Sequence, residues 1–218
     1  MNKALHCRPK WGFGHEPGCV LALPFRHLDG DSFMDRSVYG HLCTNHGSRW
    51  QLDGRYFDGV DNTRIQIPHH SSLDLIADFT IEHRVNPRIL KDNAKSLCHG
   101  LWNNFGIYSH LDAGNAILAL VVDRSGASPN FAPASNTLIA GFPNDITYVN
   151  RLGTGQSYIK GNPSAGPDTV GYAASTTKPF YIGCYDDLTM VWDGLIVDFY
   201  AYNFADYAPR ILSRSIGG

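Results

Sequence analysis

The sequence predicts an all-β fold, a sandwich of two packed antiparallel sheets, and three observations support this. Apolar and polar residues alternate in short runs, most clearly at residues 79–85. Glycine (22 residues) and proline (12 residues) are spread along the chain, as expected of many short strands joined by turns. No segment shows a sustained apolar stripe of helical period. Two packed antiparallel sheets satisfy all three observations.

Size and charge narrow the classes of function. A chain of 218 residues fits one large all-β domain, and we expect residues 1–18 to form an N-terminal arm and residues 19–218 a single domain. The net charge of −2 argues against a nucleic-acid partner, which would require a cationic surplus. No apolar run reaches the length of a membrane span or a secretory signal, so we expect no membrane insertion.

The first third of the chain is expected to supply one buried strand, one loop and one hairpin. Residues 19–23 predict a buried strand that Pro24 ends, and residues 26–49, rich in Gly, Asp, Asn and His, predict a long surface loop. Residues 50–68 predict two strands that reverse at Asp58-Gly59, a pair suited to a tight turn. Within the second of these strands, Arg64 and Gln66 should face water, and Ile65 and Ile67 should face the core.

The alternating pattern continues through the rest of the chain. Residues 112–115 predict a hairpin turn, residues 161–179 a loop and residues 208–213 a short helix. The strand at residues 116–123 is apolar on both faces and should be central in its sheet. The further strands are expected at residues 79–85, 101–111, 146–149, 156–160, 180–183 and 192–203.

The five cysteines are widely spaced, form no CxxC pair and are odd in number, which favours buried free thiols over a zinc knuckle or a disulfide framework. They are Cys7, Cys19, Cys43, Cys98 and Cys184.

The order of several short motifs is similar to that of a known family. The motifs are LALPF, FDGVDNTRIQIP, SSLDLIADFTIEHRVNP, YIKG, FYIG and WDGLIVDFYAYN. Over residues 19–212 the chain resembles the laminin-G-like, concanavalin-A-like jelly-roll family, whose scaffold serves carbohydrate binding, adhesion, virion assembly and polysaccharide cleavage. Members often carry an acidic pair in the last strand, where this chain has Val197-Asp198. The resemblance therefore implies no cofactor beyond a structural calcium ion, with Asp198 as the candidate ligand.

A carbohydrate site would use aromatic rings that stack on sugars beside amide or charged groups that bind hydroxyls. Trp102, Asn103, Asn104 and Tyr108 fit that chemistry and are the candidate carbohydrate-binding residues. The opposing interpretation places the tryptophans in the core or at strand edges. The four are Trp11, Trp50, Trp102 and Trp192.

The patterns for polysaccharide cleavage are incomplete. A glycosidase strand would carry two carboxylates two or four residues apart, whereas Asp29 and Asp31 lie in a Gly-containing loop and Asp186-Asp187 are adjacent. The resemblance to lyases of similar fold would require a His where Pro68 stands and an Arg where Thr80 stands. Glu82 and Arg84 share a strand face, and a surface ion pair explains them.

Metal binding stays open as an alternative. His69 and His70 are the closest pair of histidines, but adjacent residues on an extended chain diverge unless a loop turns them together. His83 falls on the apolar face of its strand, where a hydrogen-bonded core histidine is expected.

We therefore expect a non-catalytic β-sandwich module for binding or assembly, either a decoration- or fibre-type structural protein of a virion surface or an adhesin. Its partners would be other protein subunits in an assembly, including copies of itself, or surface glycans, and its location the virion surface or the extracellular space. The alternatives are a lectin-like carbohydrate-binding domain and a polysaccharide lyase or hydrolase of the same fold.

Overall fold

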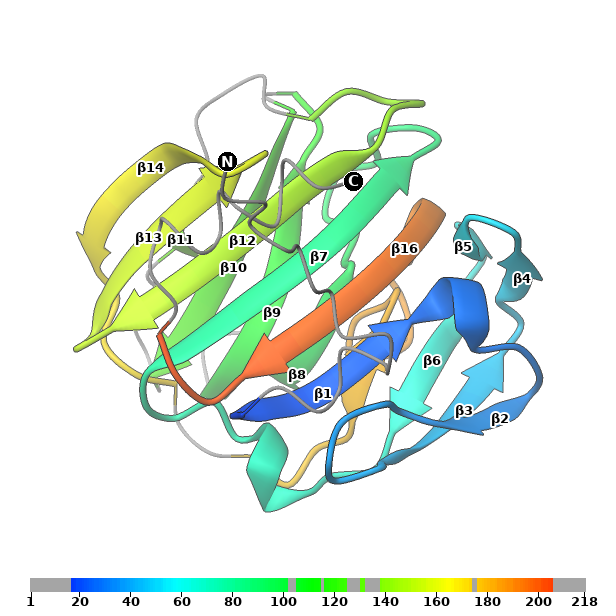
Figure 1. The fold of residues 1–218 in the computed structure, drawn as a ribbon. Helices are drawn as coiled ribbons and strands as arrows, with labels where there is room; N and C mark the ends of the chain where they lie inside the picture. Colours follow the sequence, from blue (N-terminus) through cyan, green and yellow to red (C-terminus); the bar gives the residue numbers. More distant parts are fainter. Residues whose placement is uncertain are drawn as a thin grey trace, which may run out of the picture.

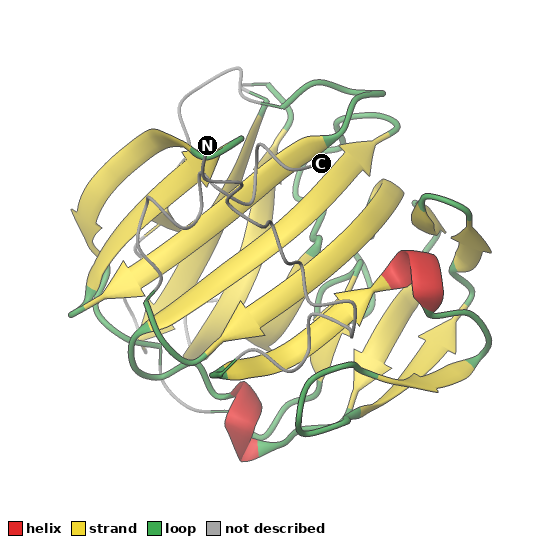
Figure 2. Cartoon of the chain, in the orientation of Figure 1, coloured by secondary structure: helices red, strands yellow, loops and turns green. Residues whose placement is uncertain are grey.

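Two eight-stranded sheets lie face to face, and the strand pairs within them are antiparallel (Figure 1). The helical structure among the described residues is limited to two single 3₁₀ turns, η2 (Phe25–His27) and η3 (Ser71–Leu73) (Figure 2). The predicted all-β jelly-roll sandwich is confirmed. This computed structural model describes residues 17–101, 105–114, 116–124, 130–131, 138–173 and 176–205.

The sheet nearer the viewer in Figure 1, here called the front sheet, is organised around its longest strand, β16 (Asp193–Tyr202). The first half of β16 pairs with β5 and the second half with β1, so β5 and β1 follow one another along the same edge of β16. On one side of β16 the spatial order toward the sheet edge is β7 (Phe79–Pro87), β12 (Asn144–Arg151), β13 (Thr154–Ile159) and β14 (Asn162–Thr169). On the other side lie β5 (Gly54–Asp58) and then β4 (Arg49–Gln51), and β1 (Cys19–Pro24) follows β5 along the same edge of β16.

The second sheet, here called the back sheet, differs from the sequence prediction at two places. The single strand expected at residues 101–111 is divided between β8 and β9, which pair with each other. The apolar strand expected to be central, β10, lies next to the two-residue edge strand β11. The order is β11 (Asn130–Phe131), β10 (Ile117–Arg124), β9 (Phe105–Asp112), β8 (Leu97–Leu101), β15 (Phe180–Ile182), β6 (Arg64–Ile67), β3 (Leu42–His46) and β2 (Ser32–Met34).

The predicted hairpin at residues 50–68 is wrong. β5 belongs to the front sheet and β6 to the back sheet, so the chain changes sheets between them. Asp58 Oδ1 accepts hydrogen bonds from Val60 N and Thr63 Oγ1 and shapes this crossing. The true hairpin is β4–β5, in which Gln51 lies opposite Gly54. The Asp-Gly signal therefore marked a change of direction without specifying the sheet that the chain enters.

The strand with the clearest predicted alternation, β7, lines the core between the sheets. Every second residue of β7 from Phe79 to Val85 is buried, so this prediction is confirmed. His83 is fully enclosed between the rings of Tyr148 and Phe199, with Nε2 3.4 Å from Ser96 Oγ. Burial lowers the pKa of His83 to about 3, so the ring is neutral at pH 7. The prediction of a hydrogen-bonded core histidine is confirmed.

Two expected loops contain strands. The loop expected at residues 26–49 includes β2 and β3, and the loop expected at residues 161–179 includes β14. β14 carries Pro163 and Pro167, which a sheet tolerates because this strand lies at its edge. The helix expected at residues 208–213 lies outside the described residues.

The cysteine prediction is confirmed for the four cysteines that the structure describes, which are buried and form no disulfide with one another: Cys19, Cys43, Cys98 and Cys184. Cys7 lies outside the described residues. Within the described part of the chain, no helix has the length and apolar character needed to cross a membrane.

Candidate functional site

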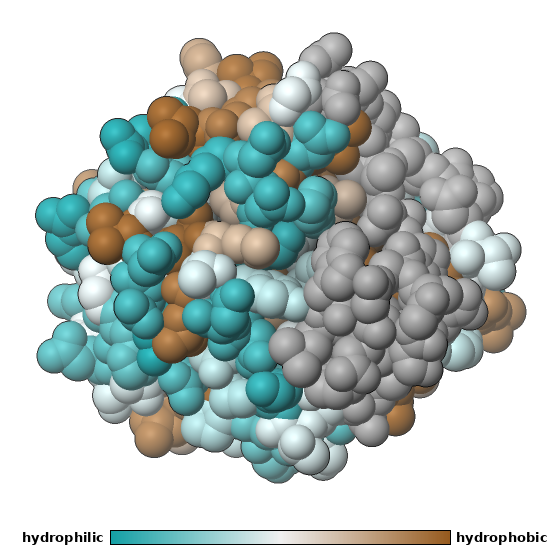
Figure 3. All heavy atoms as spheres, turned by 180° about the vertical axis from the view of Figure 1, so that it is seen from behind, coloured by the Kyte–Doolittle hydropathy of each residue, from teal (hydrophilic) through white to brown (hydrophobic). Residues whose placement is uncertain are grey.

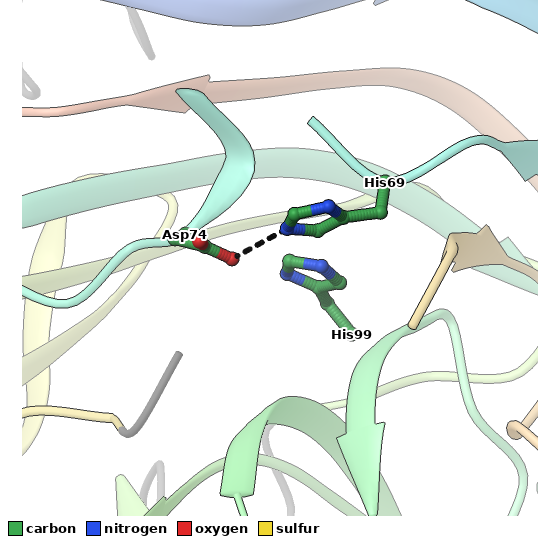
Figure 4. Close-up of side chains that lie close together, drawn as sticks. All are labelled: His69, Asp74 and His99. Carbon is green, nitrogen blue, oxygen red and sulfur yellow. Dashed lines mark ion pairs between the residues drawn. The ribbon is translucent and has the colours of Figure 1, made fainter. Parts of the chain in front are cut away.

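Three potential ligand side chains from separate segments meet where the segment containing η3 approaches β8 (Figure 4). They are His69, which follows β6, Asp74, which follows η3, and His99 on β8, and we call them the enclosed cluster. One donor atom of each residue lies within 4.8 Å of the donor atoms of the other two. Among the described residues, this is the one group of three or more His, Cys, Asp or Glu side chains with such spacing.

The local sequence explains why His69 and Asp74 converge. Pro68 follows the last residue of β6, and the chain then turns through η3. Leu73 and Leu75 are buried in the main core and anchor the segment on either side of Asp74. The two apolar anchors therefore fix Asp74 between them.

His99 is held by the strand that carries it. It lies opposite Ile107 in the β8–β9 ladder and packs on Phe180, with ring centroids 5.2 Å apart. The neighbouring strand approaches very closely, because a Cβ on Gly106 would lie 1.9 Å from the His99 carbonyl oxygen. Gly106 has φ +94°, a backbone conformation that also favours glycine.

The enclosed cluster contains a buried acceptor that makes no hydrogen bond within the described part of the chain, Asp74 Oδ1. His69 Nε2 lies 3.4 Å from it, a contact that is an ion pair only when His69 is protonated. The His69 and His99 rings stack with centroids 6.1 Å apart. A buried carboxylate oxygen without a donor is costly, which marks this position as one that a ligand would improve.

The protonation state of His99 follows from its surroundings. Burial lowers the pKa of His99 to about 4, although Asp74 and the backbone at Lys178 and Leu73 favour the charged ring. The ring is therefore neutral at pH 7. His99 Nε2 lies 3.1 Å from the Lys178 carbonyl oxygen, which can only accept, so Nε2 carries the proton and Nδ1 keeps its lone pair.

His70 turns to the other side of the same segment and joins what we call the open cluster, which consists of Tyr39, His41, His70 and Ser72. Ser72 Oγ lies 2.9 Å from His70 Nδ1 and 3.1 Å from His41 Nε2. Tyr39 stacks on His41 with ring centroids 5.6 Å apart. His70 also caps η3, because its side chain accepts a hydrogen bond from Ser72 N. The open cluster thus serves as a capping network, and the Asp35 carboxylate beside it accepts a hydrogen bond from the His41 backbone N–H.

Of the predicted carbohydrate-binding residues, Trp102, Asn103 and Asn104 lie outside the described residues. Tyr108 is described and is fully buried on the outer face of the back sheet, where the segment around Tyr185 covers it. Its ring therefore does not face solvent, and the predicted site gains no support from it.

A buried amine accompanies Tyr108. The Lys95 Nζ lies 3.1 Å from His110 Nδ1 and 5.5 Å from the centre of the Tyr108 ring. Burial lowers the pKa of Lys95 to about 8. The tyrosine face stabilises the fraction that stays charged.

The other candidates take part in structural contacts. Asp198, the possible calcium ligand, lies opposite Arg84 in the β7–β16 ladder. Arg84 is paired with Asp145 on β12, and that hydrogen bond, with a further contribution from Asp198, raises the pKa of Arg84. A guanidinium so close to Asp198 opposes binding of a second cation there. The expected partner of Arg84 was Glu82, whereas the structure provides Asp145.

The carboxylates weighed for glycoside hydrolysis also have local partners. Asp186 pairs with Lys178 at 3.0 Å, and Asp187 accepts hydrogen bonds from Thr189. Asp29 and Asp31 lie in the exposed loop whose carbonyl groups bind the buried Arg55 guanidinium.

Sequence reasoning identified His69 but missed Asp74 and His99. It did anticipate that His69 and His70 would diverge, and the structure confirms this. The signal for Asp74 was its place five residues after His69 across a turn. His99 lay too far along the chain for any local pattern to connect it.

A sequence profile of the concanavalin A-like lectin/glucanases superfamily, of laminin G type, matches residues 57–211. The chain belongs to this superfamily. No curated protein sequence matches it.

Solved structures extend the likeness across nearly the whole chain. The binding domain of Paraclostridial Mosquitocidal Protein 1 is 17% identical with a TM-score of 0.70, over 91% of this chain and 52% of that one. The botulinum neurotoxin type G receptor-binding domain is 16% identical with a TM-score of 0.70, over 91% of this chain and 51% of that one. Trypanosoma rangeli sialidase is 17% identical with a TM-score of 0.65, over 93% of this chain and 33% of that one. At these identities the likeness establishes the fold. The chain spans about half of each toxin domain and a third of the sialidase.

Proposed function

We propose that this chain is a non-catalytic recognition module that attaches to a partner protein surface, as an adhesin or as a structural protein on the surface of a virus particle. The fold supports a binding role in general, because two structures of similar fold are toxin binding domains. The sialidase shares the fold as well, so the choice between binding and catalysis depends on side chains.

The observation that carries the proposal is the exposed apolar hairpin β2–β3. Four large hydrophobic side chains on it face solvent, with exposed fractions of 52% for Met34, 66% for Val38, 47% for Tyr39 and 49% for Leu42. Exposed apolar groups rimmed by polar residues are typical of protein interfaces. In the view from behind, apolar residues lie among hydrophilic ones on the described part of the surface (Figure 3). Tyr39 also has a stacked partner, His41, which reduces the entropy lost when a partner orders the ring.

Carbohydrate recognition is a second candidate, and one residue of the front sheet favours it. Trp50 on β4 is 39% exposed, and its indole N–H donates to the Arg26 carbonyl oxygen at 3.2 Å. A fixed indole with an open face suits stacking on a sugar ring. The strand-edge position expected for Trp50 agrees with β4 as an edge strand, and Trp192 is buried as expected.

The test compares variants of the two surfaces. We expect Tyr39→Ala combined with Leu42→Ser to abolish capture of the natural partner surface, whether whole target cells or virus particles. Leu152→Ser is the matched control, because Leu152 is 78% exposed but lies at the β12–β13 turn. Capture unaffected by the hairpin variant, or catalytic turnover of a polysaccharide, would contradict the proposal. Loss of glycan-array binding by Trp50→Ala alone would favour the second candidate.

A further inference from the structure

We propose that His69, Asp74 and His99 form a binding site for one divalent transition-metal ion of the zinc class. Two imidazoles and a carboxylate make up a nitrogen and oxygen donor set that such ions prefer. Calcium and magnesium prefer sites built from oxygen alone. The site is separate from the Asp198 position and from the exposed hairpin.

The spacing of the donors fits a small ion. Zinc ligands lie about 2.1 Å from the metal, so two of them in a tetrahedral site are about 3.4 Å apart. His69 Nε2 and Asp74 Oδ1 are separated by 3.4 Å. The donor atom of His99 lies within 4.8 Å of both, so a shift of about 1 Å would complete the triangle.

Two features of the cluster point to a ligand independently of the spacing. Asp74 Oδ1 is buried and accepts no hydrogen bond from any described residue, and Figure 4 shows it directed at His69, with which it forms an ion pair when that ring is protonated. A cation would compensate the lost hydration of this oxygen. His99 is only 2% exposed and already donates from Nε2 to the Lys178 carbonyl group. That contact orients the ring and leaves Nδ1 as the lone-pair donor, as in the outer shell of zinc sites.

The fourth position would remain open. The His69 side chain is 30% exposed, whereas that of Asp74 is 13% exposed, so solvent reaches the cluster from the His69 side. Water or a group from outside the chain could fill this position. The ion would connect the segment after β6 with β8, two parts of the back sheet that β15 separates.

The experiment uses the full chain after removal of metal with a chelator. We expect calorimetric titration with Zn²⁺ to give one ion per chain, and Co²⁺ to give the visible absorption bands of a nitrogen and oxygen site of low coordination number. His69→Asn should weaken Zn²⁺ binding by at least about 100-fold, because a ligand matters more than its outer-shell support. Ca²⁺ should give no heat.

The matched control is the same substitution at the next residue. His70→Asn also removes an imidazole, but asparagine is a good N-cap, so η3 stays capped. We expect it to leave Zn²⁺ affinity within twofold of the original. Equal losses in the two variants, a loss confined to His70→Asn, or no stoichiometric Zn²⁺ binding by the original chain would overturn the proposal. Circular dichroism of each variant checks that the sandwich is intact.

Discussion

The enclosed and open clusters lie on the two sides of one short segment, and they start from adjacent histidines with opposite outcomes. His69 turns toward a buried carboxylate and a second imidazole, and His70 turns toward a hydroxyl group and a tyrosine ring. Among the residues that the structure describes, none donates a hydrogen bond to Asp74 Oδ1 of the enclosed cluster, whereas Ser72 connects the histidines of the open cluster. The comparison teaches that the groups around a histidine decide whether it can act as a metal ligand.

His83 provides the strongest test of this comparison, because it is fully buried and burial alone accounts for the shift of its pKa. The pKa of His83 is about 3 in the folded chain and about 6.5 when unfolded, so between these values the unfolded chain binds more protons. The free energy of unfolding should therefore fall as the pH drops from 6.5, by up to about 3 kcal/mol at pH 4. Urea unfolding at several pH values measures this, and His83→Leu should flatten the profile. An equally steep profile in that variant would contradict the assignment.

Asp74→Asn tests the enclosed cluster through the difference between its effects on stability with and without Zn²⁺. Without metal, the substitution removes a poorly solvated charge and should change the free energy of unfolding by less than about 0.5 kcal/mol. With Zn²⁺ at 100 times its dissociation constant, the original chain should gain about 2.7 kcal/mol, and the variant almost none. Thermal unfolding with and without Zn²⁺ gives both values. A variant stabilised as much as the original would show that Asp74 is not a ligand.

Ser72→Ala tests the open cluster. It removes the hydroxyl group that connects His41 with His70, so we expect a loss of about 1 kcal/mol in the free energy of unfolding. Affinity for Zn²⁺ should stay the same, because Ser72 contacts neither His69 nor His99. Calorimetry on the same preparation checks this, and a large loss of Zn²⁺ binding would indicate that the two clusters act as one.

Tyr39→Ala should have the smallest effect on stability. The ring is half exposed and contributes mainly its stack on His41, so the free energy of unfolding should change by less than about 0.5 kcal/mol. Urea unfolding measures the change. A loss above 2 kcal/mol would place Tyr39 among the supports of the fold and remove it from the proposed recognition surface.

The sequence predicted strands wherever one side of the strand faces the core and the other faces water. β7 and β13 follow this rule, and the alternation appears in the burial of their residues. β12 does not, because its residues from Ile146 to Asn150 are all buried. β14 carries two prolines and was expected to be a loop. It forms a strand because an edge strand of a sheet tolerates residues that lack a backbone N–H donor. The crossing from β5 to β6 was mistaken for a hairpin, since a local turn does not reveal which sheet the next strand enters.

The candidate site was predictable only in part. His69 stood out through its neighbour His70, but the partner on β8 lies 30 residues along the chain from it, and the sheet order brings the two together. Tyr108 resembled a surface aromatic because its strand also alternates, yet a distant segment covers that face of the back sheet. Alternation identifies the two faces of a strand and does not identify a second layer that folds over one of them.

The proposed metal site depends on Gly106, a residue that supplies no ligand atom, because its backbone lies against the His99 carbonyl group. Any side chain at position 106 would push β8 aside and move the imidazole with it. In related chains, glycine at this position and histidine on the strand beside it should be kept or lost together. A search for metal sites that considers ligand residues alone would overlook this requirement for a glycine on the neighbouring strand.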